Sequence, residues 1–164
     1  MRPEETFLFP FAGRQVELHA FYLYTRATAA QRCLVCNGAG PRRFGWLVPD
    51  TICGLCITEA ANLHDWDFQW GETIEDFHSA NRTFKNNMLR LAEALRLKEA
   101  EGNPGWLRRK WNNYMHDRRC EIIEEEYFKA VEAFGGPIFW KKRDVGFSWK
   151  DLIRPGDGLI IRSA

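Results

Sequence analysis

The stretch CLVCNGAGPRRFGWLVPDTICGLCITEAANLH, residues 33–64, contains four of the five cysteines of the chain. They form two pairs of equal spacing, Cys33-x2-Cys36 and Cys53-x2-Cys56. Two residues between cysteines let both sulfurs of a tight turn reach one ion, and four thiolates complete the tetrahedron that zinc prefers. The spacing therefore predicts one structural Zn²⁺ held by these four cysteines. An iron–sulfur cluster or a set of redox dithiols is the alternative.

The residues beside the cysteines predict the local fold. Asn37 and Gly38 follow the first pair, where a zinc knuckle needs a residue that tolerates positive φ. The second pair leads directly into ITEAANLH, which has the pattern of a short amphipathic helix. A knuckle, a hairpin and a ligand pair at a helix start make up a treble clef. We expect residues 33–64 to form such a module within a single domain, residues 1–164.

This module resembles the zinc-binding domain at the N-terminus of the ClpX unfoldase family. The likeness rests on Cys33, Cys36, Ile52, Cys53, Cys56 and Glu59. The resemblance implies a structural zinc and a role in dimerisation and in docking of substrates and adaptors. It covers residues 33–64 only, and no G-x-x-x-x-G-K-[ST] nucleotide-binding motif occurs in the chain. The first pair, CLVCNGAG, is also similar to half of the CxxCxGxG motif of DnaJ-type zinc centres.

The same residues bear on catalysis. A catalytic zinc keeps an open position and generally includes His among three protein ligands, whereas four cysteines close the site. Nucleases of the HNH type place a catalytic His in the treble-clef hairpin, and residues 37–52 contain no His. We therefore expect that the protein is not an enzyme. A treble-clef nuclease-like enzyme is the second alternative.

Composition and charge narrow the class of protein further. The chain has 164 residues, 45% of them hydrophobic, and a formal net charge of +1. This balance does not by itself indicate an anionic partner. No apolar run is long enough for a membrane span, and the N-terminus lacks the basic-then-apolar order of a signal peptide. We expect a cytoplasmic protein without membrane contact, where disulfides are rare; a secreted protein with two disulfides is the alternative.

Residues 73–101 have the pattern of a long helix. Thr73 and Asp76 are spaced as a capping box. An apolar seam recurs at steps of three and four residues; it consists of Ile74, Phe77, Asn81, Phe84, Met88, Leu91 and Leu95. Asn81, its one polar member, is of the type that fixes the register or the partner of a helix.

The sequence GNPG at 102–105 ends that helix, and residues 106–134 read as a second one. Its apolar stripe consists of Cys120, Ile123, Tyr127, Val131 and Phe134. We expect an antiparallel helical hairpin over residues 73–134.

The two ends of the chain predict short strands. RQVELHAFYLYTR, residues 14–26, alternates as a strand does, and Pro10 and Gly13 make a preceding hairpin plausible. Residues 65–72 read as a polar–aromatic link, and residues 137–164 as short strands or an irregular wrap. The expected fold class is α+β: a four-cysteine zinc treble clef packed on a long antiparallel helical hairpin, with short terminal strands.

The segment WLRRKWNNYMHDRR, residues 106–119, interleaves aromatic and basic side chains. Leu107, Trp111 and Tyr114 share one helix face and are expected in the core. The alternative is contact with nucleic acid, because basic groups neutralise phosphates and aromatic rings stack on bases. The candidate residues for this contact are Arg42, Arg43, Arg108, Arg109, Lys110, Arg118, Arg119, Lys141, Lys142 and Arg143.

Other polar clusters receive structural interpretations. His116 and Cys120 are expected to be ordinary surface groups, with a second metal site or a Cys–His nucleophile as the alternative. Glu121, Glu124, Glu125 and Glu126 are expected on a solvated surface. No role is assigned to the other histidines.

The functional expectation is a non-enzymatic regulator or adaptor that docks on a larger protein. It rests on the closed metal site, the lack of a recognisable catalytic motif and the seam of the long helix. The residues expected to contact a partner helix are Phe77, Asn81, Phe84, Met88, Leu91 and Leu95. A homodimer is a further expectation. A nucleic-acid-binding regulatory factor that uses residues 106–119 is the first alternative.

Overall fold

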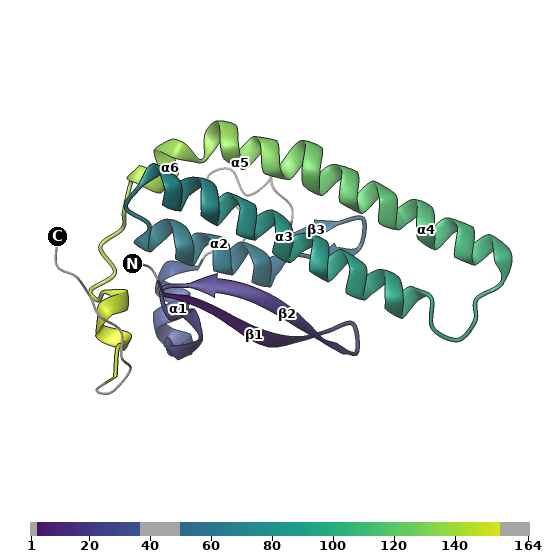
Figure 1. Cartoon of the computed structure of the whole chain (residues 1–164), viewed down its shortest axis with the longest axis horizontal. Helices are drawn as coiled ribbons and strands as arrows, with labels where there is room; N and C mark the ends of the chain where they lie inside the picture. The colour runs from purple at the N-terminus through teal and green to yellow at the C-terminus, as the bar shows by residue number, and fades with distance from the viewer. Residues whose placement is uncertain (1–2, 37–49, 155–164) are drawn as a thin grey trace.

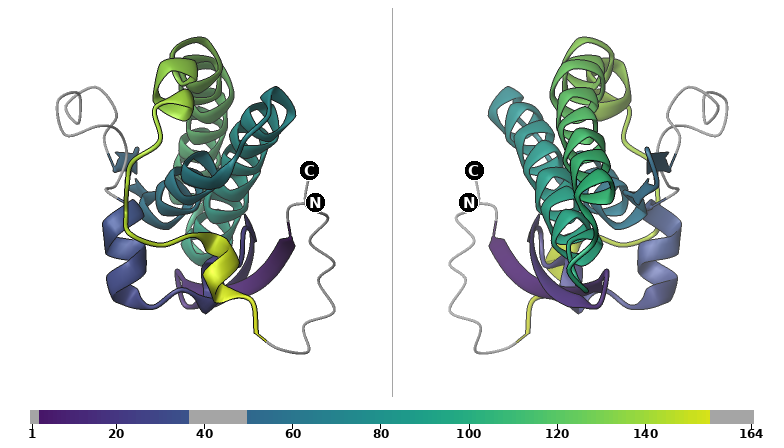
Figure 2. Two further views of the ribbon diagram at one scale, coloured as in Figure 1. Left: turned by 90° about the vertical axis from the view of Figure 1, so that its left-hand side faces the viewer. Right: turned by 90° about the vertical axis from the view of Figure 1, so that its right-hand side faces the viewer.

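The structure is a computed structural model that describes residues 3–36 and 50–154. In chain order the elements are β1 (Glu4–Phe11), β2 (Arg14–Phe21), the 3₁₀-helix η1 (Tyr24–Arg26), α1 (Ala29–Val35), β3 (Thr51–Ile52), β4 (Leu55–Cys56), α2 (Thr58–Trp70), α3 (Ile74–Glu99), α4 (Trp106–Glu121), the π-helix η2 (Ile122–Tyr127), α5 (Phe128–Phe134), α6 (Gly136–Trp140) and the 3₁₀-helix η3 (Trp149–Leu152). The expected α+β class is confirmed. Helix α3 lies between the β1–β2 hairpin and the α4–α5 rod (Figures 1 and 2).

The N-terminal hairpin forms as predicted, but β2 ends at Phe21, and residues 24–26 form η1 instead of the end of the predicted strand. Strands β1 and β2 pair antiparallel, with Phe11 opposite Arg14. The two residues between them, Ala12 and Gly13, have φ values of 52° and 78°. Positive φ at both central positions is typical of the tight turn whose twist matches that of the strands. Alternate residues of β2, Val16, Leu18 and Ala20, are buried, so one face of the hairpin covers the helices.

The outer edge of β2 is closed by side chains from two helices. The amide of Asn87 on α3 accepts from His19 N at 3.0 Å and donates to His19 O at 2.8 Å. Asp67 on α2 accepts from Phe21 N at 3.3 Å. Backbone groups that no neighbouring strand pairs are thereby satisfied inside the fold.

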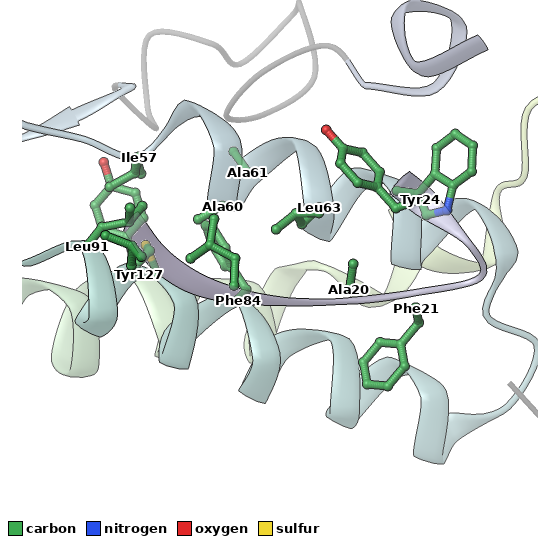
Figure 3. Close-up of a cluster of buried hydrophobic side chains, with 14 of the residues drawn as sticks. Ala20, Phe21, Tyr24, Ile57, Ala60, Ala61, Leu63, Phe84, Leu91 and Tyr127 are labelled. Carbon is green, nitrogen blue, oxygen red and sulfur yellow. The ribbon is translucent and has the colours of Figure 1, made fainter. Parts of the chain in front are cut away.

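Helix α3 begins with the predicted capping box. Thr73 Oγ1 accepts from Asp76 N, and Asp76 Oδ2 accepts from Thr73 N, both at 3.1 Å. Its seam faces the protein's own core, with Phe77, Asn81, Phe84, Met88 and Leu91 buried and Leu95 packed at the margin. Figure 3 shows Ile57, which precedes α2, Leu91 of α3 and Tyr127 gathered in this core. Only Ile74 leaves the pattern, with 49% of its surface exposed.

The returning helix is continuous through α4, η2 and α5, and it packs against α3, so the predicted helical hairpin is confirmed. Ile123 and Tyr127 are buried as expected, and Val131 packs on the core. Phe134, the last member of the predicted stripe, is 75% exposed. Phe134 is the last residue of α5, and α6 begins two residues later.

Two predicted segments differ from the structure. The link expected at 65–72 is mostly helix, because α2 continues to Trp70. The acidic residues of this segment made it read as polar, but the helix is buried nearly all round. Trp66 is fully buried, and Asp67 accepts a hydrogen bond from a backbone amide. In the C-terminal region, the described residues 137–154 contain α6 and η3 rather than strands. Residues 155–164 lie outside the described part.

Within the described residues, no helix combines the length and apolar character that crossing a membrane requires.

Candidate metal centre and binding surface

The second cysteine pair lies on a tight hairpin that leads into a helix. Strands β3 and β4 pair through Ile52 and Leu55, and the turn between them consists of Cys53 (φ 48°) and Gly54 (φ 78°). The backbone of Ile52, Leu55 and Ile57 is anchored by buried side chains, whereas Cys53 and Cys56 are exposed. Helix α2 starts two residues after Cys56. The helix after the second pair is as predicted, but the prediction placed this pair at the helix start, whereas Cys53 lies in the hairpin turn and Cys56 in β4.

The first pair sits differently from the prediction. Cys33 lies inside helix α1, and Cys36 is the residue that caps its C-terminus. A capping box of Thr28 and Gln31 starts this helix, with Gln31 N donating to Thr28 Oγ1 at 3.2 Å. The treble-clef prediction did not include a helix here. Asn37 and Gly38, which the prediction placed in the knuckle, lie outside the described residues.

Both pairs lie against the first half of α2. Cys36 Sγ donates to Asn62 O at 3.2 Å, and Cys56 Sγ lies 3.4 Å from Thr58 Oγ1. Thr58 and Asn62 are one helical turn apart, about 6 Å along the axis. Within residues 3–36 and 50–154, however, no three potential ligand side chains form a metal-binding group.

Arginine side chains surround the two pairs. Arg119 Nε donates to Cys53 O at 3.1 Å, and the Arg143 guanidinium donates to Val35 O beside Cys36. Burial raises the pKa of Cys36 to about 12, which nearby carboxylates reinforce and the positive charges of Arg32 and Arg143 oppose. A metal ion would have to displace this proton. Four thiols suit zinc, and a four-thiolate zinc centre carries two net negative charges. The donor set and its cationic surroundings therefore fit the ion.

Arg119 also joins the β3–β4 hairpin to the helical hairpin of α3 and α4. Its guanidinium makes two hydrogen bonds to the Glu99 carboxylate, at 3.0 and 2.8 Å, and the residue is 3% exposed. A planar guanidinium matches a carboxylate in this two-bond arrangement. Arg119 was a candidate for nucleic-acid contact, but its fork is occupied inside the protein.

The first half of α4 is a second notable surface. The expectation that Leu107, Trp111 and Tyr114 are in the core is wrong, because they are 72%, 60% and 54% exposed, and Trp106 is 65% exposed. Every residue from 105 to 111 is exposed. Figure 1 shows the reason, since the α3–α4 hairpin extends beyond the β1–β2 hairpin, and none of the labelled helices and strands covers its outer side there.

The predicted basic residues do not all gather on this surface. Arg108, Arg109 and Lys110 are exposed beside the aromatic residues. Arg118 pairs with Glu121. Arg42 and Arg43 lie outside the described residues.

The three basic residues near the C-terminal region are placed elsewhere in the fold. The Lys142 ammonium donates to Phe68 O, and burial lowers its pKa to about 8. Arg143 N donates to the Gln69 side chain, which in turn donates to Arg143 O. All three basic residues are exposed, but these hydrogen bonds hold Lys142 and Arg143 against α2.

The His116–Cys120 pair has the geometry of a weak contact. Cys120 Sγ lies 3.6 Å from His116 Nε2, which lies 3.9 Å from Glu93 Oε2. Burial raises the pKa of the Cys120 thiol, and the carboxylates of Glu124 and Asp117 raise it further. A cysteine nucleophile needs a lowered pKa, so these surroundings oppose that role.

Sequence reasoning missed a polar network that joins three helices. His64 Nε2 on α2 and Asn81 Oδ1 on α3 are 2.8 Å apart. Asn81 Nδ2 donates to Glu132 on α5 at 2.8 Å, and the other oxygen of Glu132 lies 2.8 Å from His78 Nδ1. Burial lowers the pKa of His64 to about 4. The polar residue on the α3 seam was the signal for this network, since Asn81 connects α3 to its neighbours within one chain.

Comparison of the chain with family models, curated proteins and solved structures finds no match. The likeness of residues 33–64 to the ClpX zinc-binding domain therefore stays a prediction.

Proposed function

We propose that this protein is a non-enzymatic, zinc-stabilised binding protein, a small regulator or adaptor, and that the outer face of α4 is its binding surface. The observation that carries the proposal is the exposure of Trp106, Leu107, Trp111 and Tyr114 on one projecting helix. Large apolar side chains left together in water are typical of interaction sites.

The proposed role of zinc is to hold the fold together. Cys33, Cys36, Cys53 and Cys56 would bind it, joining the end of α1 to the β3–β4 hairpin as a treble-clef-like centre. In this role the ion contributes folding free energy and no reaction chemistry. The support is the second pair on its tight turn, the contacts of both pairs with α2, and the arginines near them.

The structure changes which surface is proposed for the partner. The apolar seam of α3 packs inside the chain and is not exposed to a helix of another protein. It consists of Phe77, Asn81, Phe84, Met88, Leu91 and Leu95. The same finding removes that seam as a homodimer contact. The binding surface must then come from side chains that remain outside the core, and the outer face of α4 has the largest such group on one element.

Affinity capture with matched surface variants tests the proposal. The wild-type chain, Trp111→Ser and the control Phe134→Ser would each be used to capture partners at one bait concentration, with and without nuclease. Both variants remove one large exposed aromatic side chain from the same helical rod. We expect a stoichiometric partner to be lost with Trp111→Ser and kept with Phe134→Ser. Identical recovery with the two variants would exclude α4 as the binding surface.

A further inference from the structure

The exposed face of α4 interleaves rings and positive charges. Trp106, Lys110 and Tyr114 follow at intervals of four residues and share one side of the helix. Lys110 Nζ lies 5.6 Å from the centroid of the Trp106 ring. Leu107 and Trp111 form the adjacent row, and the Trp111 and Tyr114 ring centroids are 5.8 Å apart. Lys110 thus stands between the rings of this face, and Arg109 and Arg108 flank it, three residues from Trp106 and Trp111 respectively.

The charge of this region is positive and uncompensated. Residues 102–116 contain no Asp or Glu, and Arg108, Arg109 and Lys110 lie among them. The acidic residues at the end of α3 have other partners: Glu99 pairs with Arg119, and Glu101 with Lys98 and Arg14. Among the described residues, no carboxylate forms an ion pair with these three cations. An anionic partner would neutralise them.

We infer that the outer face of α4 binds single-stranded nucleic acid, an inference that rests on the proposed binding function of this helix. Phosphates would be neutralised by Arg108, Arg109 and Lys110, and unpaired bases would stack on the exposed rings of Trp106 and Trp111. A single strand offers both chemistries at short, regular intervals, as this surface does. Every base has a π-face, so this contact requires no particular sequence.

The same observations disfavour other occupants. A second copy would bring the same three cations against each other, with no acidic residue in 102–116 to pair with them. An anionic bilayer would take up a helix whose apolar face is free of charge, whereas Lys110 stands between Trp106 and Tyr114. A duplex keeps its base faces stacked inside, so only its phosphates could contact the surface.

Fluorescence anisotropy with the full chain tests the inference. The probes are labelled 20-nucleotide single-stranded RNA and DNA of mixed sequence and the matching DNA duplex. Flotation with phosphatidylserine-containing vesicles is run alongside. We expect single strands to bind more tightly than the duplex, with affinity that falls as salt increases. The RNA and DNA arms show whether the sugar matters.

Two variants and their controls separate stacking from charge. Trp106→Ala/Trp111→Ala should weaken single-strand binding about tenfold or more at unchanged salt dependence. Arg108→Gln/Arg109→Gln/Lys110→Gln should reduce the slope of log affinity against log salt by about 2, since each phosphate contact on a single strand contributes about 0.7. The controls are Phe134→Ala for the rings and Arg82→Gln/Lys141→Gln/Lys150→Gln for an equal loss of exposed charge.

Each outcome decides the inference. It is overturned if the control variants lose as much affinity as the α4 variants, if the duplex or the vesicles bind better than single strands, or if no oligonucleotide binds at low salt. If oligonucleotides fail to bind while capture of a partner still depends on Trp111, only the identity of the partner is wrong. If capture also ignores Trp111, the proposed function fails as well.

Discussion

Helices α3 and α4 belong to one hairpin, yet they use their apolar residues in opposite ways. The α3 side chains Phe84, Met88 and Leu91 are buried between α2, the β1–β2 hairpin and the returning rod. The α4 side chains Leu107 and Trp111 have the same helical spacing and lie in water. Spacing thus says which residues share a face, but the face is buried only where the rest of the chain supplies a surface opposite. The contrast places the buried apolar seam on α3 and leaves apolar side chains of the first half of α4 exposed.

Metal removal should have the largest effect on stability. The proposed zinc centre supports the β3–β4 hairpin, which anchors α4 through Arg119. Cys33→Ser and Cys53→Ser should each give protease-sensitive protein that has lost zinc, since structural zinc contributes about 10 kcal/mol or more in small zinc modules. Native mass spectrometry should find one zinc in the wild type and in the control Cys120→Ser. Metal-free wild-type protein with full protease resistance would refute the zinc proposal.

Truncation of the α3 seam should cost the next largest amount. Phe84→Ala removes a buried ring and leaves a cavity, so the free energy of unfolding should fall by roughly 3–5 kcal/mol. Urea titration followed by circular dichroism measures this change. A loss below about 1 kcal/mol would mean that α3 is not the core helix described above.

The anchor of α4 is tested by Arg119→Ala. The substitution leaves the half-buried Glu99 carboxylate without its partner and Cys53 O without a donor, so we expect a loss of about 3 kcal/mol. Arg109→Ala on the same helix is the matched control and should change stability little, because that side chain is exposed. Equal losses in the two variants would contradict the proposed anchor.

The buried network should make stability depend on pH. The pKa of His64 is about 4 in the folded protein and near 6.5 when unfolded, so the unfolded chain binds the proton more readily. Stability is then complete above pH 6.5 and falls by roughly 2–3 kcal/mol as the pH approaches 4. His64→Gln should flatten this profile in urea titrations across that range. Glu132 and His78 belong to the same hydrogen-bond network, so the pH dependence of the stability of Glu132→Gln is measured as a second check.

The smallest effect on stability is expected on the outer face of α4. Trp111→Ala and Leu107→Ala should change the free energy of unfolding by less than about 0.5 kcal/mol, since neither side chain is buried in the described fold. Trp111→Ala should nonetheless weaken partner binding. A large loss of stability with either one would erase the contrast between the two helices.

The elements that depend on local signals could be predicted from sequence. The Thr73–Asp76 capping box, the heptad seam and GNPG define α3 within a residue or two of its observed ends. Helix α2 was missed in its second half because Asp65 and Asp67 read as solvent-exposed. The carboxylate of Asp67 is satisfied by Phe21 N, which comes from a strand 46 residues earlier. No local pattern carries that information.

The candidate site divides in the same way. The helix that begins at Thr58 was predicted, but the hairpin of Cys53 and Cys56 was not, although Gly54 permits the positive φ of its turn. The position of Cys33 in a helix depends on the Thr28–Gln31 box, a signal present in the sequence but outweighed by the cysteine pattern. The exposure of Trp111 and the burial of Arg119 depend on where the α3–α4 hairpin extends beyond the core. This depends on the tertiary fold and not on a local sequence pattern.

The Asn87 clamp on β2 has a consequence for how copies of this protein could associate. The side-chain amide of Asn87 supplies an N–H donor and an oxygen acceptor, so it occupies the strand edge as a neighbouring strand would. Replacing Asn87 with Asp would place an oxygen against His19 O, and this hydrogen bond would be lost. Asn87 thus keeps this part of the β2 edge from pairing with a strand of another copy, because an unpaired edge is a template for strand addition.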